Sequence, residues 1–159
     1  MPKKLIHVLA TGLYLGHAPK APGTFGTLLG IPLTILFFQF GAYGYMGASI
    51  LFIIISIFIA DLYEKQQETH DNSEIVIDEI AGFLVTMVWL PLTWQTFVAA
   101  FILFRILDAL KPFPISYVDR KIEGGLGGVA DDILAGVIAN VLLQLVYTQT
   151  DWLGVQLLQ

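Results

Sequence analysis

Acidic side chains stand at the ends of apolar segments, in a pattern that could bind a metal ion. Asp78–Glu79 opens one such segment, Asp131–Asp132 opens another, and Asp108 lies near the end of a third. Hard cations such as Mg²⁺ prefer carboxylate oxygens together with the phosphates of a substrate. Because carboxylates packed closely need a cation, the pattern predicts a Mg²⁺ site with the ligands Asp78, Glu79, Asp108, Asp131 and Asp132. Carboxylates in a first helical turn also complement the helix dipole, which is the simpler explanation for Asp78 and Glu79.

Basic side chains accompany these acids. Arg105 lies three residues before Asp108, which places both on one face of a helix. A local ion pair would explain Arg105, and snorkelling would explain Lys111. Both residues nevertheless lie at the end of an apolar segment, where charge is costly and ionisable residues are candidates for function. Arg105 and Lys111 are therefore predicted to hold a phosphate, and Arg120, which ends the same motif FRILDALKPFPISYVDR, is the third candidate for this role.

Two glycine-containing stretches have the composition of phosphate-binding turns. In APKAPGTFGT, residues 18–27, the prolines hold the chain extended and Thr24 is the predicted N-cap of the next helix. Such a turn can present backbone N–H groups to a phosphate, so Thr24 is a predicted substrate-binding residue. An ordinary Pro/Gly loop explains the same residues. Gly124–Gly128 are predicted to form a flexible or phosphate-cradling loop, after which Asp131 and Asp132 open the last helix.

Five apolar segments must position these side chains. They are Thr27–Tyr43, Tyr45–Ala60, Ile80–Leu92, Trp94–Leu110 and Ile133–Tyr147. A zigzag of these segments through a bilayer puts residues 1–26, 61–79 and 111–132 on one side. Those stretches, with Arg105 and Asp108, hold all 8 Lys/Arg and 12 of the 13 Asp/Glu. The candidate chemistry is thus predicted to lie at one membrane face.

Composition favours a membrane protein. The chain has 159 residues, 56% hydrophobic and 13% charged, whereas a soluble domain has about 25% charged residues. The apolar segments, 13 to 17 residues long, are shorter than the roughly 20 residues of a typical span, so a soluble or peripheral helical bundle is the alternative. We expect a single all-α domain, residues 1–159. It would be a multi-helix membrane bundle of about four to five hydrophobic helices, with an N-terminal amphipathic helix, Lys3–Leu15.

The charges also predict orientation and exclude several functions. Every Lys and Arg falls on the same side of the zigzag, which should therefore face the cytoplasm. The net charge of −5 argues against nucleic-acid binding. The chain has no cysteine, so disulfides and thiolate chemistry are excluded. The expected partners are the membrane and an anionic lipid headgroup, and the oligomeric state stays open.

Four motifs together resemble the phosphatidylglycerophosphatase A family of bacterial membrane phosphatases. They are APGTFGTLLGIP, HDNSEIVIDEIAGF, FRILDALKPFPISYVDR and GGLGGVADDILAGV, and their order and spacing match over roughly Gly16 to Val141. The residue before Pro19 and Lys20 look variable in character, which puts a substrate role for His17 or Lys20 in doubt. The resemblance implies an all-helical enzyme of the bacterial inner membrane. It also implies Mg²⁺-dependent removal of the terminal phosphate from phosphatidylglycerophosphate to give phosphatidylglycerol.

This resemblance implies catalytic roles as well. Five acids are too many ligands for one Mg²⁺, so either two ions bind or some acids act as nucleophile or base. His70 or Asp71 could activate water or protonate the leaving alkoxide, and Asp78 could act as nucleophile or base. Direct attack by water and an aspartyl-phosphate intermediate both remain open.

Other classes fit the sequence less well. A membrane transporter or channel would place ionisable residues near the bilayer midplane, where these segments carry none. A CDP-alcohol phosphotransferase would carry a DGxxAR-type signature, which is absent. A related lipid-phosphate phosphatase is the nearest alternative within the same chemistry. A structural membrane subunit would leave the acidic motifs without a reason.

Overall fold

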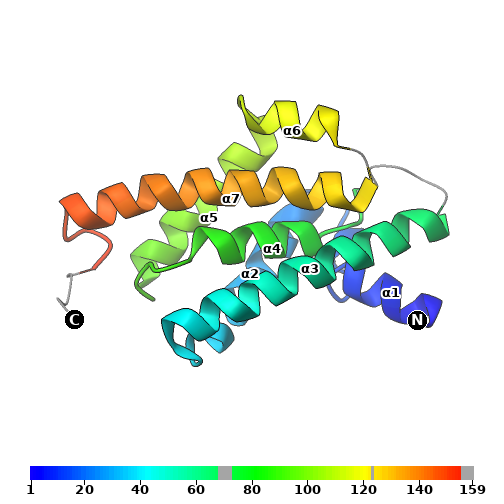
Figure 1. The fold of residues 1–159 in the computed structure, drawn as a ribbon, viewed down its shortest axis with the longest axis horizontal. Coiled ribbons are helices and arrows are strands. Elements are labelled where there is room, and N and C mark those ends of the chain that lie inside the picture. The colour runs from blue at the N-terminus through cyan, green and yellow to red at the C-terminus, as the bar shows by residue number, and fades with distance from the viewer. Residues whose placement is uncertain (68–72, 123, 155–159) are drawn as a thin grey trace.

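All regular secondary structure among the described residues is helical, which confirms the all-α prediction (Figure 1). The computed structural model describes residues 1–67, 73–122 and 124–154, and no strand occurs within them. These residues form seven α-helices and one 3₁₀ helix: α1 Lys3–Ala10, η1 Leu15–His17, α2 Pro22–Phe38, α3 Gly41–Gln67, α4 Ile77–Thr86, α5 Trp94–Leu110, α6 Ile115–Lys121 and α7 Gly124–Gln149.

The short helix α4 forms the centre of the bundle. It lies between α7 and α3 in Figure 1, with α2 behind it, and seven of its ten residues are buried. The most extensive helix contact joins α4 to α7, where a Cβ at Gly136 would lie 2.3 Å from the carbonyl oxygen of Gly82. A Cβ at Gly82 would in turn lie 2.7 Å from the carbonyl oxygen of Asp132. The two backbones therefore touch, and Asp132 is held directly beside α4.

Helix α4 ends inside the protein because side chains from α3 and α7 take up its last carbonyls. The Tyr45 hydroxyl donates to the Leu84 carbonyl at 2.7 Å. The Asn140 amide donates to the carbonyls of Thr86 and Val88, each at 2.8 Å, and Gln144 donates to Val88 at 3.0 Å. Helix ends leave carbonyls without partners, and burying them unsatisfied is costly. These donors allow α4 to stop at Thr86, so the predicted helical segment Ile80–Leu92 is wrong beyond that residue.

Of three other predicted elements, one agrees with the structure and two differ from it. Trp94–Leu110 coincides with α5, and the Lys-Pro pair ends that helix as expected. The predicted helix Lys3–Leu15 is wrong beyond Ala10, because positive φ angles at Gly12, Leu13 and Tyr14 reverse the chain. The predicted Gly124–Gly128 loop is also wrong, since these glycines form the first turns of α7.

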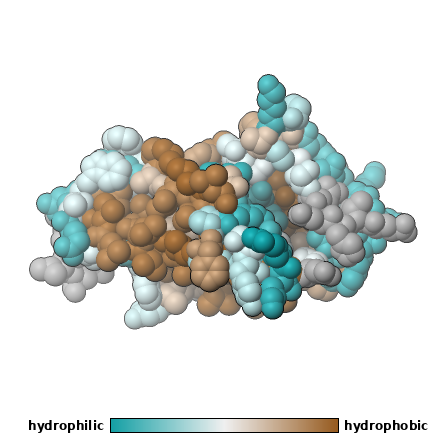
Figure 2. Space-filling view, turned by 90° about the horizontal axis from the view of Figure 1, so that it is seen from above, coloured by the Kyte–Doolittle hydropathy of each residue, from teal (hydrophilic) through white to brown (hydrophobic). Residues whose placement is uncertain are grey.

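A broad apolar surface surrounds this core. Helices α3 and α7, of 27 and 26 residues, are long and apolar enough to cross a membrane. Figure 2 shows a hydrophobic band across the molecule, with most hydrophilic residues gathered toward one end. Large exposed side chains on α3, α5 and α7 include Ile50, Leu51, Ile54, Phe58, Val98, Ile102, Ile106, Val141 and Leu145. Soluble monomers rarely expose an apolar surface of this extent, so the surface supports a membrane protein.

The exposed tryptophans mark the end opposite the charges. Trp94 begins α5, Trp152 follows α7, and Trp89 follows α4, so all three lie far from the acidic ends of those helices. Tryptophan is enriched where membrane meets water. The molecule thus has an apolar middle, one end rich in tryptophan and one end rich in charge.

Adding a methyl group at the α4–α7 contact should test this architecture. Gly136→Ala would force the two backbones apart, and we expect a loss of about 1–3 kcal/mol in unfolding free energy, the usual cost of overpacking. Gly47→Ala is the matched control, because a Cβ at Gly47 on α3 meets nothing within 4 Å. Thermal unfolding in detergent should rank Gly136→Ala below wild type and Gly47→Ala at or slightly above it. Equal stability of the two variants would contradict the close packing.

Candidate functional site

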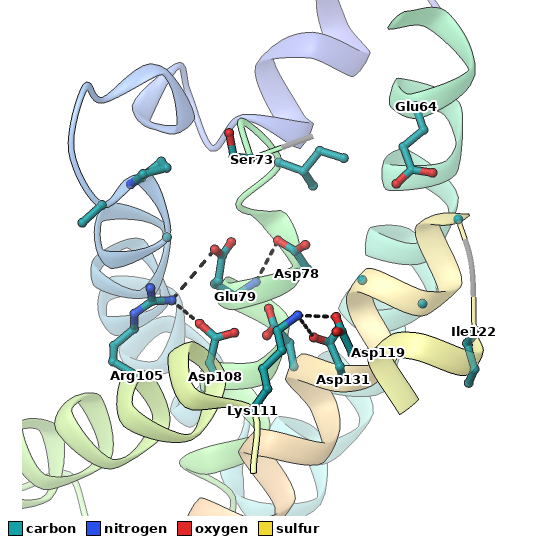
Figure 3. Close-up of a pocket in the computed structure, with 18 residues that line it drawn as sticks. Glu64, Ser73, Asp78, Glu79, Arg105, Asp108, Lys111, Asp119, Ile122 and Asp131 are labelled. Carbon is teal, nitrogen blue, oxygen red and sulfur yellow. Dashed lines mark hydrogen bonds and ion pairs between the residues drawn. The ribbon is translucent and has the colours of Figure 1, made fainter. Parts of the chain in front are cut away.

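A pocket of about 580 Å³ opens at the charged end of the bundle (Figure 3). Helices contribute to it by their ends: the first turns of α2, α4 and α7, and the last turns of α3 and α5. Helix α6 closes one side through Asp119. Seven of the lining residues are acidic and two are basic, namely Glu64, Asp78, Glu79, Asp108, Asp119, Asp131 and Asp132, with Arg105 and Lys111.

All five predicted metal ligands converge on this pocket. Asp78 and Glu79 come from the first turn of α4, Asp108 from the last turn of α5, and the Asp131–Asp132 pair from the third turn of α7. Their carboxylates form two overlapping groups, Asp78–Glu79–Asp132 and Asp108–Asp131–Asp132, and Asp132 belongs to both. Within each group, one oxygen from every residue lies within 4.8 Å of the others. This spacing suits either one shared cation or two neighbouring ones.

Burial raises the free energy of these carboxylates in their charged form unless a cation neutralises them. The residues Asp131 and Asp132 are only 3% and 4% exposed. Among the described residues, Glu79 Oε2 and Asp131 Oδ1 are buried without a hydrogen-bond partner. A buried acceptor left unsatisfied costs about 1–3 kcal/mol, and more when it is charged. The donor set is made of hard carboxylate oxygens, which are the ligands that Mg²⁺ prefers.

Arg105 bridges two of the acidic helix ends. Its guanidinium forms an ion pair with Asp108 on the same helix, and its Nη1 lies 3.9 Å from Glu79 Oε1 on α4 (Figure 3). Gly23 leaves room for this arrangement, because a Cβ there would lie 2.8 Å from the Arg105 Nη1. Arg105 therefore holds the ends of α4 and α5 together beneath the start of α2.

Lys111 links α6 to α7 across the pocket mouth. It caps α5 in a left-handed conformation, with φ at 43°. Its ammonium pairs with Asp119 and lies 2.6 Å from Asp131 Oδ2 (Figure 3). Partial burial by itself lowers the pKa of Lys111, but the hydrogen bonds to Asp119 and Asp131 outweigh it and raise the pKa above its ordinary value. The lysine is therefore a permanent cation inside the acidic cluster.

The remaining predicted site residues lie elsewhere. Thr24 is not the N-cap of α2, because that helix begins at Pro22 after a left-handed Ala21. The α2 residues that line the pocket are Pro22 and Gly23 rather than Thr24. The side chain of Arg120 is exposed on α6 and donates to the Ser116 carbonyl of its own helix. The predicted catalytic residues His70 and Asp71 lie outside the described residues.

Sequence reasoning gave no role to Asp119 and Glu64, which also line the pocket. The signal for Asp119 was its place beside Arg120 in the motif FRILDALKPFPISYVDR, one of the four that carry the family resemblance. Glu64 lies in the last turn of α3, beyond the predicted apolar segment. Both belong to elements that reach the pocket only through tertiary packing.

Comparison with known proteins gives a consistent match. The family model described as phosphatidylglycerophosphatase A matches residues 8–147. The chain is 40% identical over 138 residues to phosphatidylglycerophosphatase A of Escherichia coli, covering 86% of this chain and 80% of that protein. It is 39% identical over 145 residues to the Haemophilus influenzae protein of the same name, covering 87% and 86%. A putative phosphatidylinositol-3-phosphatase of Bacteroides thetaiotaomicron is 36% identical over 155 residues, covering 89% and 93%. No solved structure matches significantly.

Removing the Lys111 ammonium should show how much the buried acids destabilise the protein when they lack a cation. Lys111→Met leaves Asp131 without its cation, and we expect a loss of about 1–2 kcal/mol in unfolding free energy, because Lys111 is partly exposed and screened. The matched control is Lys65→Met, which breaks the exposed Lys65–Asp61 pair and should cost at most about 0.5 kcal/mol. The double variant Lys111→Met/Asp131→Asn should recover most of the loss in thermal unfolding without divalent cations. Equal effects of both lysine variants would argue against a strained acidic cluster.

Proposed function

Since the chain belongs to the phosphatidylglycerophosphatase A family, we infer that it is a phosphatidylglycerophosphatase, a hydrolase of phospholipid metabolism. The substrate is phosphatidylglycerophosphate, from which the enzyme removes the terminal phosphate to give phosphatidylglycerol. One observation carries this proposal most directly: five carboxylates and two cations from the ends of three helices, α4, α5 and α7, meet in a single pocket at the charged end of an apolar bundle. Such a site suits a phosphate that projects from the membrane surface.

The proposed cofactor is Mg²⁺, held by Asp78, Glu79, Asp108, Asp131 and Asp132. The buried oxygens of Glu79 and Asp131 that lack hydrogen-bond partners support this assignment. The pocket lining also has seven acids against two bases, so a phosphate dianion would be repelled unless further positive charge were present. When bound, a divalent cation would neutralise the charge that builds up on the transferring phosphoryl group. The carboxylates themselves fix where that positive charge sits.

Arg105 and Lys111 are the proposed phosphate ligands. Both face the pocket, and both are paired with carboxylates at its wall. We propose that the Lys111 ammonium keeps Asp119 as its partner while its contact with Asp131 gives way to the metal and the phosphate oxygens. The partial exposure of Lys111 leaves it accessible to a headgroup arriving from the aqueous side. Thr24 and Arg120 remain predictions that lack a pocket contact in support.

Hydrolysis forms a bond between a water oxygen and phosphorus and breaks the bond to the glycerol oxygen, which then takes up a proton. Asp78, with its Oδ1 held by the Glu79 N–H at 3.0 Å, is the proposed base or nucleophile at the pocket floor. His70 and Asp71, eight and seven residues before it, are proposed to activate water or protonate the leaving oxygen. Acid quenching during turnover of ³²P-labelled substrate separates the two routes, because only an aspartyl-phosphate leaves the label on the protein.

The proposed setting is the bacterial inner membrane, with the pocket facing the cytoplasm. Helices α2, α3, α5 and α7 would form the hydrophobic bundle, with α4 enclosed among them. Helix α1 would lie in the interface as an amphipathic helix, with Ile6 and Ala10 packed inward. The exposed tryptophans would then lie at the membrane–water boundary on the side of the inner membrane away from the cytoplasm. This arrangement brings the lipid phosphate to the pocket without removing the acyl chains from the bilayer.

A phosphate-release assay tests the proposed function. The full chain in mixed micelles should release phosphate from phosphatidylglycerophosphate with Mg²⁺, and EDTA should abolish the release. Asp132→Asn and Glu79→Gln should each lower kcat by on the order of 100-fold or more, because each removes a carboxylate from the metal groups. Asp61→Asn, which changes an exposed acid outside the pocket lining, is the matched control and should stay near wild type.

Three outcomes would overturn parts of this proposal. Normal turnover in Asp132→Asn and Glu79→Gln would remove the metal assignment. Phosphatidic acid and phosphatidylinositol 3-phosphate should be assayed beside the main substrate, because one relative is named as a putative phosphatidylinositol-3-phosphatase. Faster release from either would change the substrate, and no release from any lipid would contradict the enzyme assignment.

Substitutions of Arg105 and Arg120 test whether an arginine must line the pocket to contribute to activity. Arg105→Gln should lower kcat/KM by at least about tenfold, since it removes a cation that faces the reacting phosphate. Arg120→Gln should change kcat/KM by no more than about twofold, because its side chain is exposed and bonded within α6. Steady-state kinetics in mixed micelles measures both variants. A larger loss at Arg120 would instead place the substrate across the outer face of α6.

A further inference from the structure

Two histidines meet outside the acidic pocket. His7 lies in the last turn of α1 and His17 ends η1, and the chain reversal between them brings the rings together. Their Nε2 atoms are 2.8 Å apart, the ring centroids are 4.9 Å apart and the ring planes are inclined by 25°, so the two rings meet edge to edge. Both nitrogens therefore point at nearly the same place. The phosphatase function proposed above assigns no role to either ring.

The other nitrogen of His17 is oriented by a carboxylate. His17 Nδ1 lies 3.3 Å from Glu74 Oε1, and the Tyr63 hydroxyl donates to Glu74 Oε2 at 2.7 Å. This hydrogen bond from Tyr63 is the main cause that lowers the pKa of Glu74, so the carboxylate is ionised at neutral pH. An ionised Glu74 favours the proton on His17 Nδ1, which leaves the lone pair of His17 Nε2 directed toward His7.

This chain of contacts has the form of an outer-shell arrangement at a metal site. In such sites a ligating imidazole donates its second N–H to a carboxylate, which fixes the tautomer and raises the basicity of the ligating nitrogen. Two nitrogens that bind one tetrahedral Zn²⁺ at about 2.0–2.1 Å stand roughly 3.3 Å apart. The observed separation of 2.8 Å requires only a small opening, and the partly exposed side chains leave room for water as further ligands.

We propose that His7 Nε2 and His17 Nε2 form a second cation site, selective for a borderline transition ion such as Zn²⁺, with Glu74 and Tyr63 as its outer shell. Imidazole nitrogens prefer such ions, whereas the carboxylate pocket prefers Mg²⁺. The bound ion replaces the proton that the two rings otherwise share. The ion would join α1 to η1, and Glu74 would tie both to the segment that leads into α4. That segment already contacts α1, because the Val76 N–H donates to the Ala10 carbonyl at 2.9 Å.

Zinc binding by the full chain in detergent tests this site, with excess Mg²⁺ present to occupy the acidic pocket. Equilibrium dialysis should give one Zn²⁺ per chain for wild type and also for Asp132→Asn, which impairs the pocket. Binding should be lost in His7→Gln and in His17→Gln. Glu74→Gln should weaken it by about 10–100-fold, the usual effect of losing an outer-shell partner. Asp61→Asn, another acid at the same end of the molecule, is the matched control and should bind normally.

A second measurement needs no variant. Zinc added to ¹⁵N-histidine-labelled wild type should shift the Nε2 resonances of two of the three histidines. Unchanged binding in both histidine variants, or a loss of binding in Asp132→Asn alone, would assign the zinc to the acidic pocket and overturn the proposal. No binding to wild type would leave only a hydrogen bond between the two rings. The phosphatase assay is independent of these results, since neither histidine has a role in that chemistry.

Discussion

The contact between the backbones of α4 and α7 determines most of what this molecule can do. Gly82 and Gly136 allow the two helices to touch, so Asp132 lies beside the first turn of α4. That approach places Asp132 within ligand distance of Asp78 and Glu79 on one side, and of Asp108 and Asp131 on the other. A side chain at either glycine would press against the facing backbone and push the two helices, and with them their acids, apart.

Helix α4 is a buried half-helix with opposite requirements at its two ends. Its first turn carries two carboxylates, which the helix dipole favours. Its last turn stops among apolar side chains, where free carbonyls would be costly, and Tyr45, Asn140 and Gln144 provide the donors. Irregular backbone at membrane depth is tolerated only where protein groups satisfy it. The same polar side chains therefore hold the last turn of α4 inside the bundle.

Charge in the pocket is balanced only in part by the protein. Arg105 and Lys111 each hold two carboxylates from different elements, yet the acids remain in excess and two of their oxygens lack partners. Under the proposed function, an excess of negative charge where the substrate phosphate would bind makes sense if metal cations complete the site. The pocket lies among the charged helix ends (Figure 3), where a phospholipid held by the apolar surface would present its headgroup. Structure and family membership thus lead to the same chemistry.

The sequence alone determined which residue types could do chemistry and at which end of the helices they stand. It also determined the all-helical class, the bounds of α5 and, through four motifs, the family. These features depend on local composition and spacing. Only the tertiary structure decided that Gly124–Gly128 are helical, that α4 stops at Thr86, that Lys111 pairs with Asp119 and Asp131, and that Thr24 and Arg120 lie off the pocket lining. It likewise decided that His7 meets His17. Each of these depends on a contact or a chain reversal that the hydrophobic pattern of a single segment does not encode.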